Sequence, residues 1–293
     1  MGHGSWKKET FACYSRSLGR SYSEDTGRVE GQTYTAHKMD QSLDPKYFEV
    51  RECCNSEDHP NTIPVILALD VTGSMGEACN ETAAALGVII SNLYNKIKDV
   101  EFCVMGIGDL AYDDAPVQMS QFESDIRIAE SLDKIYLEMG GGGNRYESYT
   151  AAWYMGLKRT KLDCYDKQGR KGIIITMGDE PLNPYLPYRE LNSDTNAKEQ
   201  ADIDTEELYV QASEKFDIFH IAVDSPKDCY AHYKEDIEKS FGQILGQNLK
   251  VATINNLAQV IEECIMASVN GAGIAPATDS GTTTTNENGE ICW

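Results

Sequence analysis

Apolar residues follow two different periods along the chain between residues 62 and 270. Short, continuous apolar runs such as 65–69 are typical of strands that are buried on both faces of a sheet. Longer segments such as 82–98 repeat apolar residues every three to four positions, which predicts helices with one buried face. The expected strands are 65–69, 102–107, 117–122, 172–177, 216–223 and 249–253, and the expected helices are 82–98, 124–138, 147–159, 205–215, 229–245 and 257–269.

The alternation of strands and helices predicts an α/β fold with a doubly wound, mostly parallel six-stranded sheet and helices on both faces. Segment 108–116 is turn-like, so we expect 117–122 to pair antiparallel with the strand before it. In doubly wound folds, ligands bind beyond the carboxyl ends of the strands, near the point where the strand order reverses. Four acids follow expected strands and should share that edge: Asp70, Asp109, Asp179 and Asp224.

The segments on either side of this region differ from it in composition. Residues 1–61 are polar and rich in Ser, Tyr and Gly, but their aromatic content is too high for plain disorder. We therefore expect an extended N-terminal arm that packs on a domain formed by 62–270. Residues 271–293 hold mainly Thr, Asn, Gly and Glu, which predicts a disordered tail.

Charge and cysteine content exclude several classes of partner. The 293 residues include 26 Lys and Arg against 47 Asp and Glu, a net charge of −21. Such a surface repels phosphate backbones and anionic membranes, so we expect neither nucleic acid nor a membrane as partner. The sequence has no apolar stretch approaching the ~20 residues of a membrane span. Its nine cysteines form no Cys-x-x-Cys pair, and several lie in apolar runs, which is typical of reduced thiols in a cytoplasmic protein.

Asp70 is followed by hydroxyl side chains at alternate positions, Thr72 and Ser74, directly after the first buried strand. Hard divalent cations such as Mg²⁺ prefer oxygen ligands, with room left for waters and for a ligand from outside. The same Ser and Thr residues could instead cap the helix that follows. The loop is therefore a candidate metal site, with a helix cap as the alternative.

Segment 70–74 resembles the metal-ion-dependent adhesion site, Asp-x-Ser-x-Ser, of von Willebrand factor type A (VWA) domains, with Thr72 in the second place. The resemblance covers roughly residues 62–268, and the arm looks similar to that of uncharacterised stand-alone bacterial VWA proteins. It implies a VWA-like fold that holds Mg²⁺, or else Mn²⁺ or Ca²⁺. It also implies that Asp179 is a further ligand that acts through water. The other acids at this edge, Asp109, Glu180 and Asp224, are expected to form an acidic rim.

The sequence departs from the family at the second metal loop, where VWA domains supply a threonine. Here a glycine run, 140–143, leads to three candidate ligands: Asn144, Glu147 and Ser148. Glycines would let the backbone approach the ion closely. We favour Asn144 or Ser148, because an acid in the first turn of a helix already has a stabilising role against the helix dipole.

The resemblance implies a binding module rather than an enzyme, with an acidic residue of a partner protein completing the coordination of the metal. A metal-dependent phosphohydrolase is the alternative, although Thr72 stands where those enzymes have a second acid for proton transfer. A third possibility is an assembly subunit that acts with a AAA+ ATPase, as some bacterial VWA proteins do. A phosphate-binding Gly-x-x-x-x-Gly-Lys-[Ser/Thr] motif is absent from the sequence, which excludes nucleotide hydrolases of that class.

Overall fold

The computed structural model describes residues 4–138, 144–224 and 229–271. A sheet of six strands forms its centre, in the order β12, β11, β8, β4, β5, β6. The strands are parallel except for β6, which runs antiparallel to β5. This arrangement confirms the predicted fold class, including the antiparallel strand. The strands are β4 (Ile63–Asp70), β5 (Val100–Ile107), β6 (Val117–Met119), β8 (Gly172–Gly178), β11 (Phe216–Asp224) and β12 (Leu249–Thr253).

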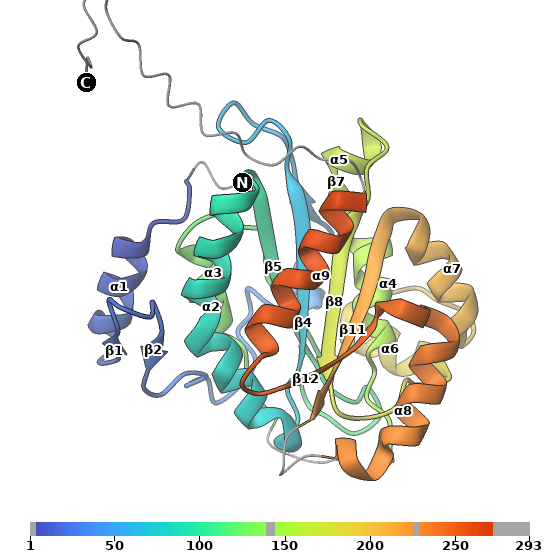
Figure 1. Ribbon diagram of the computed structural model, residues 1–293. Helices are drawn as coiled ribbons and strands as arrows, with labels where there is room; N and C mark the ends of the chain where they lie inside the picture. The colour runs from blue at the N-terminus through green and yellow to red at the C-terminus, as the bar shows by residue number, and fades with distance from the viewer. Residues whose placement is uncertain (1–3, 139–143, 225–228, 272–293) are drawn as a thin grey trace, which may run out of the picture.

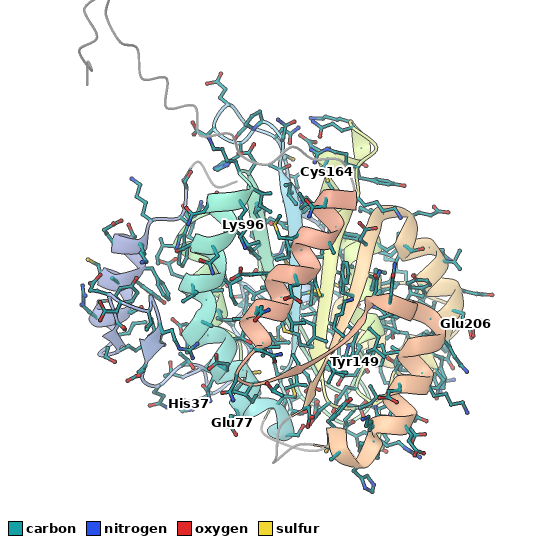
Figure 2. The ribbon with its side chains drawn as sticks, viewed as in Figure 1. His37, Glu77, Lys96, Tyr149, Cys164 and Glu206 are labelled. Atoms are coloured by element: carbon teal, nitrogen blue, oxygen red, sulfur yellow. The ribbon has the colours of Figure 1, made fainter. Side chains whose placement is uncertain are left out.

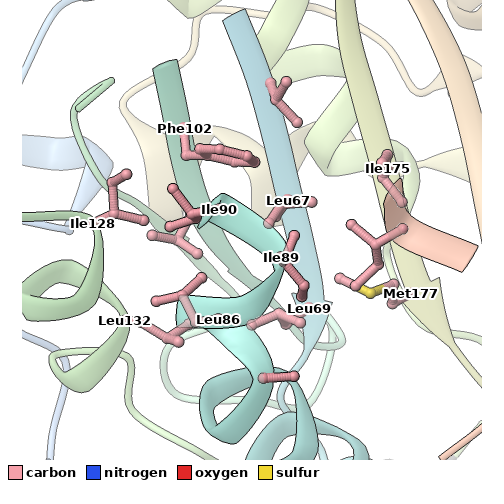
Figure 3. Close-up of a cluster of buried hydrophobic side chains, with 14 of the residues drawn as sticks. Leu67, Leu69, Leu86, Ile89, Ile90, Phe102, Ile128, Leu132, Ile175 and Met177 are labelled. Carbon is pink, nitrogen blue, oxygen red and sulfur yellow. The ribbon is translucent and has the colours of Figure 1, made fainter. Parts of the chain in front are cut away.

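Helices cover both faces of the sheet (Figure 1). Successive residues of β4 therefore enter different cores: Leu67 and Leu69 pack on one face, and Ile66 and Ala68 on the other. Figure 3 shows the first of these cores, where α2 packs against the strands. The helices are α2 (Gly76–Lys96), α3 (Arg127–Asp133) and α9 (Leu257–Gly271) on the first face, and α4 (Thr150–Arg159), α7 (Thr205–Lys215) and α8 (Tyr230–Leu245) on the second.

The strand order reverses between β4 and β8. From β4 the chain proceeds to β5 on one side, and from β8 it proceeds to β11 on the other. Asp70 is the last residue of β4, and Asp179 directly follows the last residue of β8. The two acids therefore flank the switch point, where doubly wound sheets bind their ligands.

Several short elements were not predicted, because they carry too few apolar residues to show a period. They are β3 (Arg51–Cys53), β7 (Thr160–Leu162), β9 (Tyr185–Leu186), β10 (Ile203–Asp204), α5 (Asp163–Asp166), α6 (Tyr188–Thr195), η1 (Pro45–Tyr47), η2 (Gly73–Met75) and η3 (Gly246–Asn248). Helix α3 is shorter than the expected 124–138, and Ile135 is buried from the segment that follows the helix.

The N-terminal arm packs beside α2 (Figure 1). It contains a helix that the sequence did not reveal, α1 (Lys8–Ser17), and a small hairpin of β1 (Ser21–Tyr22) and β2 (Val29–Glu30). Phe11 of α1 is buried against Gly87 of α2. Arg20 donates two hydrogen bonds to the Asp133 carboxylate, at 2.6 and 2.9 Å, which fixes the arm to α3.

The expected disordered tail lies outside the described residues, except for Gly271 at the end of α9. The glycine run 140–143 also lies outside them. In the described ranges, no helix is long and apolar enough to cross a bilayer. Eight cysteines fall in these ranges and all are free thiols, among them Cys103 and Cys264, which are buried in the cores.

We expect Gly87→Ala to destabilise the protein by about 1–3 kcal/mol. A Cβ atom at this position would lie 2.5 Å from Cε1 of Phe11 and 3.2 Å from the Gly27 carbonyl oxygen, so the arm would be forced away from α2. Urea denaturation followed by circular dichroism measures the change.

Gly242→Ala in α8 is the matched control, because no heavy atom outside its own turns of the helix lies within 4 Å of its Cβ position. Alanine there should raise the free energy of unfolding by up to about 1 kcal/mol. Equal changes in the two variants would contradict a close contact between the arm and α2.

Candidate metal site at the carboxyl edge of the sheet

Three loops meet where β4, β5 and β8 end. The first loop follows β4 and contains the short helix η2, and the third loop follows β8. The second loop directly precedes α4. It contacts the segments after β5 and β8: the Ser148 amide donates to the Gly108 carbonyl, at 3.3 Å, and Glu147 forms a bridge with Leu182. Figure 2 shows Tyr149, at the end of this loop, at the same end of the sheet as Glu77 from the first turn of α2.

Asp70 is fully buried and its carboxyl group is held by three hydrogen bonds. Oδ1 accepts from the amide and the hydroxyl of Thr72, at 3.0 and 2.6 Å. Oδ2 accepts from the Tyr149 hydroxyl, at 2.8 Å. The first and second loops are thus joined through one acid.

Asp179 is also fully buried, and it joins the first loop to the third. The Ser74 hydroxyl donates to its Oδ1 at 3.0 Å, across the switch point. The amide of Cys229, just before α8, donates to its Oδ2 at 2.9 Å. The structure therefore brings the four sequence-predicted residues to one edge as two hydrogen-bonded pairs, Thr72 with Asp70 and Ser74 with Asp179.

The pKa values of the acids at this edge are raised above the usual range for carboxyl groups. Burial, and then the charge of Asp179, raise the pKa of Asp70 to about 7. Burial, with the charges of Asp70 and Asp179, raises the pKa of Glu180 to about 8. The pKa of Asp179 itself is raised, chiefly by burial. Within the described residues no lysine or arginine pairs with these acids, and Arg145 on the second loop pairs with Asp236 instead. The edge therefore lacks a counter-charge.

The three candidates on the second loop differ in what their side chains already bind. The Asn144 amide donates to Asp109 at 2.5 Å, and its carbonyl oxygen accepts from the Tyr146 amide at 2.8 Å. The Ser148 hydroxyl oxygen accepts from the Leu110 amide at 3.1 Å. Glu147 is only 3% exposed, and its Oε2 has no hydrogen-bond partner.

The reason for favouring Asn144 and Ser148 over Glu147 was wrong. Helix α4 begins at Thr150, so Glu147 lies before its first turn and not at the position where an acid interacts favourably with the helix dipole. Burial, and then the charge of Asp70, raise the pKa of Glu147 to about 11. A carboxyl group with such a pKa is protonated at neutral pH unless a nearby cation stabilises its charged form.

The expected rim residues lie at the same edge with different exposure. Asp109 is buried, and its Oδ1 accepts from the Ala111 amide at 2.8 Å. Glu180 is half-buried beside Asp179, and Asp224 is exposed at the end of β11. Asp109 therefore belongs to the loop framework, whereas Asp224 faces solvent.

Tyr149 is the residue of this site that sequence reasoning missed. Its hydroxyl occupies the space that a side chain at position 178 would fill, since a Cβ atom there would lie 1.9 Å from it. Gly178 thus makes room for Tyr149 at the end of an otherwise apolar strand. A glycine at the end of a buried strand, next to an acid, was the signal available in the sequence.

His220 packs beneath Tyr149, with the two ring centroids 5.0 Å apart, and stacks on Phe241 at 3.6 Å. Nδ1 lies 2.8 Å from the Thr176 hydroxyl, and Nε2 has no partner. Burial lowers the pKa of His220 to about 3, so the ring stays neutral. His220 is therefore a neutral histidine of the core.

The oxygen donors present suit a hard divalent cation. Two carboxyls and two hydroxyls converge from two loops, and the orphaned oxygen of Glu147 lies in a third loop without a counter-charge. In the part of the chain that the structure describes, no group of three or more His, Cys, Asp or Glu side chains is arranged to hold a metal ion. The candidate set differs from such a group because hydroxyls of Thr72 and Ser74 supply part of it.

Two cavities flank the first and second loops. One of about 810 Å³ lies between Ser74 and the arm and is lined by Tyr34 and His37 among others. The other, of about 550 Å³, lies between Asp109 and Ser148 on one side and Tyr185 on the other. One cavity therefore adjoins Ser74 of the first loop, and the other adjoins Ser148 of the second loop.

Comparison with known proteins shows a shared fold at low sequence identity. No protein-family model matches the sequence, and no curated protein matches it either. The open conformation of the pilus adhesin SpaC from Lactobacillus rhamnosus GG aligns with a TM-score of 0.50 and 12% identity, over 74% of this chain and 31% of that chain. The vWF domain of the type V pili tip protein Mfa5 from Porphyromonas gingivalis aligns with a TM-score of 0.47 and 12% identity, over 74% and 98% of the two chains.

The chain therefore spans about a third of the adhesin's length. Identities this low show the fold alone. The six-stranded, mostly parallel sheet with helices on both faces is the arrangement expected of a VWA-like fold.

We expect Tyr149→Phe to lower the free energy of unfolding by about 1–3 kcal/mol, because it removes a buried hydrogen bond to the Asp70 carboxyl. Denaturation in the presence of a chelator measures the effect without any metal. Tyr154→Phe in α4 is the matched control: this tyrosine is also buried, but its hydroxyl donates at 2.8 Å to Glu199, whose side chain is partly exposed. A cost no larger than that of the control would show that Tyr149 does not hold Asp70.

His220 should make stability fall in acid. The unfolded chain binds a proton on this ring below about pH 6.5, whereas the folded protein binds it only near pH 3. The contribution is therefore complete above about pH 6.5 and is lost as the pH falls toward 3. We expect His220→Asn to reduce the loss of stability between pH 7 and pH 4 by about 3 kcal/mol. Identical slopes for the two proteins in chelator would contradict a neutral, buried His220.

Proposed function

We propose that this protein is a VWA-like interaction module that binds a divalent cation, in the first place Mg²⁺, at the carboxyl edge of its sheet. The hydrogen bond between Ser74 and Asp179 carries the proposal, because it joins a hydroxyl of the first loop to a buried acid of the third, across the switch point. Asp70, Thr72, Ser74 and Asp179 are the residues that would hold the ion, with the loop of Asn144, Glu147 and Ser148 beside them.

Charge supports a cation at this place. Asp70 and Asp179 are buried side by side, and each raises the cost of ionising the other. The hydroxyls of Thr72 and Ser74 now donate to these acids, and their oxygen lone pairs become available to an ion once the protons turn away. A bound divalent ion would supply the positive charge that the described residues do not.

The proposed partner is a protein that presents an acidic side chain to the ion. An ion held by hydroxyls, and by acids acting through water, keeps positive charge for an outside carboxylate. Gly73 is exposed and Ser74 is partly exposed, so this side of the loop is accessible. The cavities of about 810 and 550 Å³ on either side would take the parts of the partner that flank its acid.

We expect Mg²⁺ to raise the melting temperature relative to chelator. Free ligand at ~100 times its dissociation constant should add about 2.7 kcal/mol to the free energy of unfolding. Asp70→Asn should abolish the shift, because it removes a ligand charge. Asp224→Asn is the matched control: this acid is exposed at the end of β11, and its loss should leave the shift intact.

Equal melting temperatures in millimolar Mg²⁺ and in chelator would overturn the metal site. Hydrolysis of a generic phosphoester that is lost on Asp70→Asn would favour a phosphohydrolase instead. A partner captured equally well in chelator and in Mg²⁺, or equally well by Ser74→Ala, would show that the metal edge is not its interface.

A further inference from the structure

Glu147 is a buried acid with an unused oxygen. Its side chain is 3% exposed, and Oε2 has no hydrogen-bond partner. In the described residues no basic side chain forms an ion pair with it. An isolated buried carboxylate costs several kcal/mol unless something neutralises it.

The backbone places Glu147 above the end of β4. Its neighbour Ser148 is bonded to Gly108, beyond β5, and Glu147 itself bridges to Leu182, beyond β8. Strand β4 lies between β5 and β8 in the sheet. The segment therefore crosses over Asp70, the last residue of β4.

The other two candidates of this loop are already engaged. Asn144 uses its amide on Asp109 and its carbonyl oxygen on Tyr146, and the Ser148 oxygen accepts from Leu110. Glu147 is the candidate with a free acceptor atom that is turned into the protein.

We propose that Glu147 is a direct carboxylate ligand of the cation, supplied from within the protein at the place where VWA domains offer a neutral threonine. This inference rests on the proposed function. It gives the ion three acidic neighbours, Asp70, Asp179 and Glu147. In the described residues these acids do not form a direct three-carboxylate cage, so the proposal makes Asp70 and Glu147 direct ligands and leaves Asp179 to act through water.

A charged ligand has a consequence that a neutral ligand lacks. Coulomb attraction is proportional to the charge of the ion. The loss of one ligand charge therefore costs a trivalent ion about 1.5 times as much binding free energy as a divalent ion. The internal carboxylate also lowers the net positive charge of the site, so it weakens the attraction of the ion for a partner's acid.

The test is a titration of Tb³⁺ and Mg²⁺ into the full chain. Tb³⁺ luminescence is sensitised by a nearby tyrosine, and Tyr149 is hydrogen-bonded to Asp70; Mg²⁺ affinity follows from competition with Tb³⁺. We expect Glu147→Gln to weaken Mg²⁺ by about tenfold and Tb³⁺ by about thirtyfold. Asn144→Ala and Ser148→Ala should each change both affinities by less than about threefold.

Glu180→Gln is the control for general charge, since Glu180 is a half-buried acid at the same edge. It should weaken both ions by less than Glu147→Gln does. Melts in chelator establish that each variant folds. If Glu147→Gln does not fold, Glu147→Asp keeps the charge on a shorter stem, and it should weaken both ions while leaving their affinity ratio unchanged.

The outcomes separate this inference from the proposed function. If the unmodified protein binds neither ion, the metal site itself fails, and Glu147 with it. If the protein binds both ions and Glu147→Gln binds them as tightly, only the assignment of Glu147 is overturned. Equal weakening of Tb³⁺ and Mg²⁺ in Glu147→Gln also overturns it, because that result fits a structural role. Binding of both ions to Glu147→Asp with unchanged affinity overturns it as well.

Discussion

Two buried carboxyl groups stand at the ends of adjacent parallel strands, and the loops around them are held by the hydrogen bonds that these groups accept. Asp70 and Asp179 flank the switch point because the strand order reverses between β4 and β8. Neither group reaches water, and each raises the cost of charging the other. The surrounding residues supply hydrogen-bond donors in place of a counter-charge.

These donors connect parts of the chain that are far apart in sequence. Thr72 and Tyr149 donate hydrogen bonds to Asp70, while Ser74 and the Cys229 amide donate hydrogen bonds to Asp179. The loops after β4 and β8 and the segments before α4 and α8 are therefore fixed relative to one another by two acids. Beneath them, the neutral ring of His220 supports Tyr149 without adding a charge.

Much of the fold could be predicted because its central strands are buried on both faces. Apolar runs located β4, β5, β8 and β11, and the bounds of α7 and β12 agree with the expected 205–215 and 249–253. Helix α1 was missed because few of its residues are buried, and its contacts are with Gly87 of α2 and, through the Tyr14 hydroxyl, with Asp133 of α3, far along the chain.

The first and third loops of the site could also be anticipated, since their acids directly follow recognisable strands. The second loop could not be resolved in the same way. Which of Asn144, Glu147 and Ser148 keeps a free oxygen depends on Asp109 and Leu110, which belong to another loop. Tyr149 escaped notice for the same reason, because its role depends on space left by Gly178.

The arm's contact with α2 bears on where the folding unit begins. Trp6, Phe11 and Tyr34 belong to the same hydrophobic core as Leu86 and Ile89 of α2. Tyr34 also donates to the Cys79 carbonyl near the start of that helix, at 3.0 Å. A fragment cut at residue 62 would keep every strand of the central sheet yet leave an apolar stripe of α2 in water. The natural boundary for recombinant work, and for aligning this chain with other proteins, therefore lies at the beginning of the arm rather than at the beginning of the sheet.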